Sequence, residues 1–368
     1  MSTSNLHVDK LETYLSELYG GAVKIHFFGE LGKKKKAIKE KELKGFGYGI
    51  PYLIEFSLDS GESKRVVLET MRPSMFGHEH FADRAGILIW QHSAFNNLPK
   101  HVRSIDVGAF SSNRSLKSVG DCAEFFIVTE HVNGNPYYLD LERLKTEKKL
   151  LLIDKKRCIA LSDYLVDVHN VKLKDSQLYY RRIRDLVGHG ECIFGLTDSY
   201  PLNLDYISEQ DFVKLEKKCV QWRWKLKHKA NRLCKVHGDY HPWNVLFRED
   251  TDFTVLDRSR GEWGEAADDL AAMTINYLFY SLQAFGELAE PFRELFNLFW
   301  RNYIEKSGDE EIFSVVQPFY AWRGLVIASP LWYPNLSLNV RQRIFNFIEN
   351  VLEVEKFEVQ NVNAYFSH

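Results

Sequence analysis

The sequence predicts an α+β fold in two parts, a small antiparallel sheet followed by a larger and mainly helical region. Two β-patterned segments, 52–58 and 65–72, flank the turn Asp-Ser-Gly-Glu at 59–62, which is typical of paired strands. A second turn, Asn-Gly-Asn-Pro at 133–136, ends this part. Beyond it, apolar residues recur mostly at helical spacing, so we expect a sheet-containing region at 1–130 and a helical region at 131–368.

The first region is expected to begin with a helix at 8–19 and a strand at 23–28. A lysine run at 33–36 is interpreted as a solvated loop, with a docking surface for an anion or a membrane as the other interpretation. A helix is expected at 79–95, and the apolar stretch 123–132 is expected to be a buried strand before the hinge between the two regions. In the second region the helical patterns lie at 159–170, 176–188, 209–233, 268–285, 290–306, 311–328 and 338–353.

Composition excludes several classes of function. The 368 residues are 45% hydrophobic and carry a formal net charge of −2, so a sizeable core is expected and no basic excess indicates a nucleic-acid partner. Five cysteines without a CxxC spacing argue against a disulfide framework or a zinc site. With no signal-peptide pattern and no apolar run near the roughly 18 residues of a membrane span, we expect a cytoplasmic protein without membrane insertion. The sequence leaves the oligomeric state open.

The segment 236–247 reads Val-His-Gly-Asp-Tyr-His-Pro-Trp-Asn-Val-Leu-Phe and supplies the groups that phosphoryl transfer to an alcohol needs. Such a reaction requires a carboxylate to orient the hydroxyl group and oxygen ligands for Mg²⁺ beside the phosphates. Asp239 lies in a Gly-Asp turn, and Asn244 follows five residues later across Pro242, which interrupts any helix. Asp257 ends the returning strand. Asn244 and Asp257 suit Mg²⁺, which takes few protein oxygens.

The segment has two other interpretations. Gly, Asp, Asn and Pro are common in turns, but a turn alone does not require two aspartates and an asparagine at this spacing between two strands. His237 and His241 have the i, i+4 spacing of metal ligands on a helix, but Pro242 argues against a helix there.

HGDYHPWN resembles the HxDxxxxN signature of the aminoglycoside phosphotransferase and choline kinase group, which are relatives of the protein kinases. Two flanking stretches are similar to the same family: 264–271 (Gly-Glu-Ala-Ala-Asp-Asp-Leu-Ala) and 160–169. The resemblance covers about 40–280. It implies a two-lobed protein-kinase-like fold with a small antiparallel-sheet N-lobe that binds nucleotide and a larger helical C-lobe that holds the catalytic and acceptor sites.

The resemblance also implies roles for single residues. Asp239 becomes the catalytic base, while Asn244 and Asp257 become the Mg²⁺ ligands. His237 braces the loop, and Asp269 is a carboxylate that anchors it. The implied reaction is ATP-dependent transfer of the γ-phosphate to a hydroxyl of a small molecule.

The nucleotide-binding part departs from the family pattern. Gly45, Gly47 and Gly49 precede a strand, where a loop over the phosphates is expected; a plain hairpin turn is the other interpretation. The next strand carries Glu69 where a lysine is expected. We therefore predict that Arg72, displaced along that strand, binds the phosphates, with a surface arginine as the alternative.

The stretch 129–132 resembles the hinge whose backbone pairs with adenine, so Glu130 and Val132 are expected at the nucleotide, with His131 as an alternative pocket residue.

The acceptor is not determined by the sequence. Aromatic residues from 300 to 333 are expected to pack in the core rather than to form a cage for a quaternary amine. Glu262, Glu265 and Asp268 lie near the metal carboxylate, as a cationic aminosugar would require. Arg258 and Arg260 directly follow it, which instead favours an anionic acceptor or stabilisation of the transferred charge.

The sequence has two other functional interpretations. A non-catalytic nucleotide-binding or scaffold protein is favoured by Glu69, although such a protein needs no base. A protein kinase is disfavoured because the chain has no HRD, DFG or APE signature.

Overall fold

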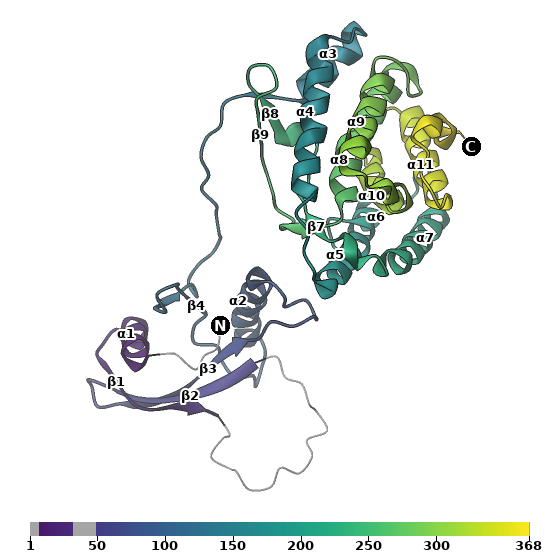
Figure 1. Cartoon of the computed structure of the whole chain (residues 1–368). Helices are drawn as coiled ribbons and strands as arrows, with labels where there is room; N and C mark the ends of the chain where they lie inside the picture. The colour runs from purple at the N-terminus through teal and green to yellow at the C-terminus, as the bar shows by residue number, and fades with distance from the viewer. Residues whose placement is uncertain (1–6, 32–48, 368) are drawn as a thin grey trace. The chain divides into compact units, whose positions relative to one another are not determined.

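The computed structural model describes residues 7–31 and 49–367 and shows an α+β protein of two compact units, Met1–Thr129 and Glu130–His368 (Figure 1). The first contains a small antiparallel sheet and the second is mainly helical, which confirms the predicted fold class. The lysine run 33–36 and the glycines Gly45 and Gly47 lie outside the described residues.

The sheet of the first unit has the order β1-β2-β3. It is formed by β1 (Val23–Glu30), β2 (Gly49–Leu58) and β3 (Ser63–Met71), all antiparallel. Alternation along β2 buries Tyr52, Ile54 and Phe56, as expected when successive side chains point to opposite faces. Ile54 and Phe56 join Leu11 and Leu15 of α1 (Val8–Tyr19) in one small core.

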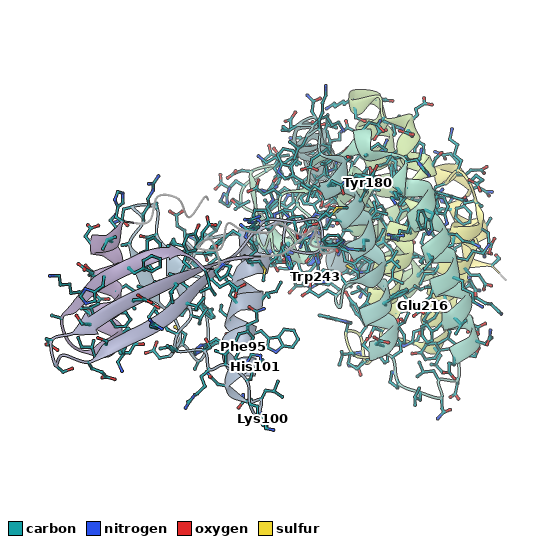
Figure 2. The ribbon with its side chains drawn as sticks, turned by 90° about the horizontal axis from the view of Figure 1, so that it is seen from below. Phe95, Lys100, His101, Tyr180, Glu216 and Trp243 are labelled. Carbon is teal, nitrogen blue, oxygen red and sulfur yellow. The ribbon has the colours of Figure 1, made fainter. Side chains whose placement is uncertain are left out.

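The rest of the first unit consists of short elements. These are α2 (Phe81–Asn96) and the hairpin of β4 (Gly108–Phe110) with β5 (Leu116–Ser118). The ring of Phe95, near the end of α2, lies 4.3 Å from that of His101 between centroids (Figure 2), so the chain turns back against the end of its own helix.

The predicted buried strand at 123–132 is wrong. Residues 122–134 form neither strand nor helix, and the side chain of Phe126 is 90% exposed. Within the described chain, β1, β2 and β3 pair only with one another. The apolar run therefore has no ladder partner, and a strand without one leaves its backbone groups to water.

The second unit contains nine α-helices among its described residues. They are α3 (Tyr138–Glu147), α4 (Leu152–His169), α5 (Ser176–Gly188), α6 (Ile193–Ser199), α7 (Glu209–Lys227), α8 (Ala266–Phe285), α9 (Phe292–Ser307), α10 (Gln317–Ala328) and α11 (Leu338–Glu353). Helix α8 packs against α3, α9 and α10 and is buried along almost its whole length. Figure 1 shows α4, α9 and α8 side by side. Among the described residues, no helix is long and apolar enough to cross a membrane.

Local sequence explains the helix boundaries. Ser208 begins α7 with a capping box, in which its hydroxyl accepts a bond from the N–H of Asp211 and the Asp211 carboxylate accepts one from the N–H of Ser208. Ser337 begins α11 by accepting from the N–H of Val340, and Gly286 ends α8 in the left-handed conformation.

Two small sheets hold the segment that contains the HGDYHPWN motif. One has the order β6-β8-β9, from β6 (Asn135–Pro136), β8 (Val245–Phe247) and β9 (Phe253–Val255). The other pairs β7 (Cys234–Lys235) with β10 (Trp263–Gly264). The motif thus spans the connection between β7 and β8, and Asp257 follows β9.

Candidate active site

The loop between β7 and β8 has a conformation that its sequence dictates. Gly238 has a φ of +86°, a left-handed conformation that other residues rarely adopt. His241 begins a single turn of 3-10 helix, Pro242–Asn244, and its Nδ1 accepts from the N–H of Trp243 at 3.3 Å. The ring of Trp243, labelled in Figure 2, stacks on Tyr138 with centroids 5.3 Å apart. These contacts fix the turn that carries Asn244.

Asp269 anchors the loop from the first turn of α8, in agreement with the role that the family resemblance implied. Its two carboxylate oxygens accept the backbone N–H groups of His237 and Gly238, each at 2.7 Å. His169 Nε2 lies 3.1 Å from the same carboxylate, which is completely buried. Burial alone would raise the pKa of Asp269, but the hydrogen bond and charge of His169 keep it below its usual value. The loop is therefore fixed to α8 by an ionised carboxylate.

His237 braces the loop from within. Its side chain is buried, and its Nδ1 accepts from the N–H of Asp239 at 3.2 Å. Burial lowers the pKa of His237, so the ring is neutral at pH 7.

Asp239 has one oxygen fully engaged and the other nearly free. Its Oδ1 accepts from Arg323 Nη1 at 2.7 Å and from Arg260 Nη1 at 2.8 Å. Its Oδ2 lies 3.5 Å from both His241 Nε2 and Asn244 Nδ2, which leaves it able to accept a stronger hydrogen bond. Burial favours the neutral form, but His241 and the two guanidinium groups outweigh it and hold the pKa of Asp239 well below its usual range.

Asn244 and the strand end that carries Asp257 are joined by backbone pairing. Val245 pairs with Val255, and the N–H of Leu256 donates to the carbonyl of Asn244 at 2.8 Å. The side-chain nitrogen of Asn244 donates to the backbone carbonyl of Asp239 at 3.1 Å, which leaves its side-chain oxygen for another partner. Asp257 is exposed and has a φ of +51°, a strained conformation of a kind found at functional sites.

The donor set at this strand end fits a magnesium ion. Asn244 and Asp257 offer an amide oxygen and a carboxylate, and Mg²⁺ prefers oxygen ligands and takes few of them from the protein. Throughout residues 7–31 and 49–367, no group of three or more His, Cys, Asp or Glu side chains is placed to hold a metal.

The arginines after Asp257 turn toward the loop. Arg258 donates from Nε and Nη2 to the carbonyl of Val236 at 3.0 and 2.7 Å. Arg260 contacts Asp239 and the carbonyl of Gly238, and its Nε lies 3.4 Å from Glu191. Arg182 of α5 donates to the carbonyls of Arg260 and Trp263. Both loop arginines thus support the backbone around Asp239.

Arg323 and its contact to Asp268 are the part of the site that sequence reasoning missed. Arg323 is the only charged residue of α10 and is 7% exposed. Its Nη2 contacts Asp268 at 2.6 Å and the carbonyl of Gly238 at 3.1 Å. Burial raises the pKa of Asp268 to about 6 even beside Arg323. A lone arginine inside an apolar helix was the available signal, because a buried charge needs a partner.

Of the predicted nucleotide residues that the structure describes, Gly49 and Arg72 belong to the first unit, and Glu130 and Val132 to the second. Gly49 begins β2, and a Cβ there would lie 2.6 Å from the carbonyl of Thr70, so close packing against β3 requires glycine. Arg72 is exposed, one residue after β3. Glu130 is exposed and Val132 partly buried, both in the irregular segment 122–134. Within the second unit, Asn244 contacts Asp239, and Leu256, the residue before Asp257, donates to the carbonyl of Asn244.

The aromatic residues of the C-terminal helices are mostly core, as expected. Trp300, Tyr303, Tyr320 and Trp322 are at most 2% exposed, so they do not form an open cage.

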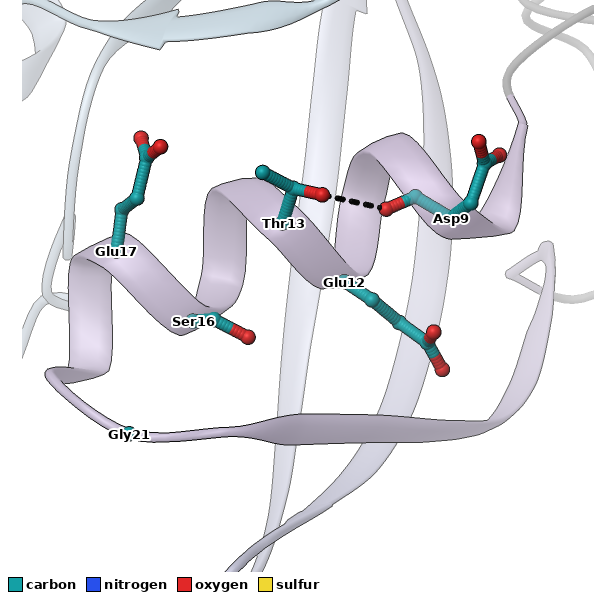
Figure 3. Close-up of a pocket in the computed structure, with 6 residues that line it drawn as sticks. All are labelled: Asp9, Glu12, Thr13, Ser16, Glu17 and Gly21. Atoms are coloured by element: carbon teal, nitrogen blue, oxygen red, sulfur yellow. Dashed lines mark hydrogen bonds between the residues drawn. The ribbon is translucent and has the colours of Figure 1, made fainter.

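A hollow of about 570 Å³ lies on the first unit, against α1 and the turn before β1 (Figure 3). Its lining includes Asp9, Glu12 and Glu17, and the Thr13 hydroxyl donates to the carbonyl of Asp9 at 2.9 Å. None of the predicted site residues lines it.

Comparison with protein families confirms the resemblance seen in the motif. Residues 124–296 match the family described as "Phosphotransferase enzyme family". This range contains Asp239, Asn244, Asp257 and Asp269, but not Arg323. None of the curated protein sequences compared with the chain matches it.

Several solved structures are similar at low identity. An amicoumacin kinase in complex with AMP-PNP, Ca²⁺ and Ami is 14% identical, with a TM-score of 0.41, over 85% of this chain and 89% of that one. A Plasmodium vivax ethanolamine kinase is 14% identical, with a TM-score of 0.34, over 91% and 83%. A spectinomycin phosphotransferase in complex with ADP and spectinomycin is 12% identical, with a TM-score of 0.32, over 99% of each chain. At these scores the likenesses carry no conclusion about activity.

Proposed function

Since residues 124–296 match the phosphotransferase enzyme family, we propose that this chain is an ATP-dependent kinase that moves the γ-phosphate to a hydroxyl group of a small molecule. The observation that carries the proposal is the state of Asp239. It is an ionised, largely buried carboxylate with Oδ1 fixed by two arginines and Oδ2 making only 3.5 Å contacts. Such an oxygen is available to an acceptor hydroxyl.

A strongly ionised aspartate is suited to this reaction, although it is a weak base. The transition state of phosphoryl transfer is loose in most analyses, so the attacking hydroxyl needs orientation more than early deprotonation. Asp239 would align the hydroxyl through Oδ2 and take up its proton as the new O–P bond forms, while the bond between the γ-phosphorus and the bridging oxygen of ATP breaks and ADP leaves. His237, Asp269 and the two arginines keep the carboxylate in place, which supplies the positioning on which the rate depends.

Asn244 and Asp257 are the residues that would hold Mg²⁺. When bound, the ion would neutralise charge on the phosphate oxygens. The chain's own contribution is to place both side chains at one strand end, through the bond from the N–H of Leu256 to the carbonyl of Asn244.

ATP binding is assigned to the first unit and to the chain that follows it. Gly45, Gly47 and Gly49 would approach the phosphates through their backbone, and Arg72 would supply a cation. Glu130 and Val132 would present backbone groups to the adenine. The proposal includes a cytoplasmic location, supported by five cysteines that are all free thiols.

A second candidate is a kinase-like protein that binds nucleotide without catalysis. The observation that favours it is Glu69, exposed on β3 where a lysine is expected. The two candidates differ in turnover, because a binding protein has no use for an oriented base.

The test is ATP turnover with Mg²⁺ across a panel of small hydroxylated acceptors, for wild type, Asp239→Ala and the control Asp163→Asn. Asp163 is a partly exposed carboxylate of α4 whose Oδ1 contacts Lys306 and Asn302 of α9. We expect transfer by wild type and control and its loss in Asp239→Ala. Binding of ATP without turnover on any acceptor would favour the second candidate.

A further inference from the structure

Arg323 reaches the loop from an element that the family match does not include. Helix α10 begins at Gln317, 21 residues after the end of the matched range at 296. It is held tightly against α11, since a Cβ at Gly324 would lie 2.7 Å from the side chain of Ile348. The guanidinium carbon of Arg323 lies 3.9 Å from the ring centroid of Trp322. Arg323 therefore lies on a buried helix that is closely packed against its neighbour.

The guanidinium group joins three acceptors from two segments. Nη1 donates to Asp239 Oδ1, while Nη2 donates to the carbonyl of Gly238 and to Asp268 Oδ1. Gly238 and Asp239 belong to the loop, and Asp268 lies in the first turn of α8. A planar fork can satisfy all three together, which the single ammonium of a lysine cannot do in the same geometry.

We propose that Arg323 is a positioning residue for phosphoryl transfer, which holds Oδ1 of Asp239 so that Oδ2 is turned toward the acceptor hydroxyl. The inference rests on the proposed function, and it assigns a role to a residue outside the matched family range. Arg260 contacts the same oxygen, but its side chain is 24% exposed and also approaches the exposed carboxylate of Glu191. Arg323 is the more buried of the two contacts, at 7% exposure.

Stability alone does not account for this arrangement. Replacing a buried ion pair by apolar side chains is often neutral or stabilising, and α10 is otherwise apolar. The three contacts converge on the one carboxylate whose orientation the reaction needs, and on the glycine that shapes its loop.

The experiment compares Arg323→Lys with the matched control Arg341→Lys in the full chain. Arg341 is also buried, at 3% exposure. Among the described residues, its side chain donates hydrogen bonds only to the backbone carbonyls of Ala328 and Tyr333. For Arg323→Lys we expect kcat to fall by about 10- to 100-fold, as misplacement of a catalytic group does. The KM for ATP should change by less than about 2-fold, since the substitution removes no interaction that the enzyme makes equally with the ground state and the transition state. The control should keep kcat per folded molecule.

A double variant decides whether Arg323 acts through Asp239. In an Asp239→Asn background, Arg323→Lys should cause no further loss of transfer, because residues that act as a unit are not additive. Additive losses, or a kcat equal to wild type in the folded Arg323→Lys variant, would overturn the inference and leave the proposed function standing. A wild-type chain that transfers phosphate to no acceptor would overturn both.

Discussion

The carboxylate of Asp269 accepts the backbone N–H of Gly238 at 2.7 Å, and through this bond α8 sets the position of the proposed base one residue later. The same carboxylate accepts the N–H of His237. Two adjacent N–H groups that point at one anion form a rigid turn, so the geometry of Asp239 depends on a residue 30 positions further along the chain.

Replacing Asp269 with asparagine should destabilise the protein by about 3 kcal/mol, because one backbone N–H loses its charged acceptor inside the core. Urea unfolding of wild type and variant measures the change. The control Asp163→Asn should stay within about 1 kcal/mol of wild type, since a partly exposed ion pair contributes little. Equal stability of wild type and Asp269→Asn would contradict the anchoring role.

Gly238→Ala should cost about 1–2 kcal/mol, because φ is +86° at this position and a Cβ disfavours that conformation. Gly188→Ala is the matched control, since it ends α5 with open space around its Cα and no positive φ. Thermal or urea unfolding should show the first loss and little change for the second. A tolerated alanine at 238 with full activity would mean that the loop does not need its observed conformation.

Asp268 should make the unfolding free energy depend on pH. Burial raises its folded pKa to about 6, above its unfolded value of about 3.9. The folded state then holds a proton that the unfolded state has released, so the contribution of Asp268 to stability falls as pH rises from about 4 to 6. The difference in unfolding free energy between wild type and Asp268→Asn should change over this window and be flat above pH 7. A difference that is constant from pH 4 to 7 would contradict the raised pKa.

Asn244→Ala should raise the Mg²⁺ concentration needed for half-maximal transfer, because it removes one proposed oxygen ligand while Asp257 remains. Titration of activity with Mg²⁺ at saturating ATP measures this. Asn170→Ala is a suitable control, since Asn170 lies at the end of α4, outside the loop. An unchanged Mg²⁺ requirement in Asn244→Ala would remove Asn244 from the metal site.

The sequence was sufficient for the fold class and for which residues meet at one loop, while the chemistry of that loop stays a prediction. Both depend on local patterns in the sequence. Alternation of apolar residues predicts β2 and β3, and helical periodicity predicts the helices of the second unit. Asp239, Asn244 and Asp257 lie close together in the sequence, in and beside one short hairpin. The structure brings these three together because Val245 pairs with Val255 and Leu256 bonds to Asn244.

What the sequence did not predict depends on contacts between distant segments. Arg323 is 84 residues from Asp239, and no local pattern specifies which carboxylate a buried arginine meets. The apolar stretch 123–132 has the pattern of a buried strand, but burial of a strand requires a partner strand, which a run of residues does not specify by itself. The expectations for Gly45, Gly47, Gly49, Arg72, Glu130 and Val132 stay predictions.

The most direct test of the account is the transfer of labelled γ-phosphate from ATP to a hydroxylated acceptor under single-turnover conditions, for wild type, Asp239→Asn and the control Asp163→Asn. The account predicts that the rate falls by a factor of at least about 100 in Asp239→Asn, as expected when a positioned base is lost, with ATP affinity and fold retained. A rate in Asp239→Asn equal to that of wild type would contradict it.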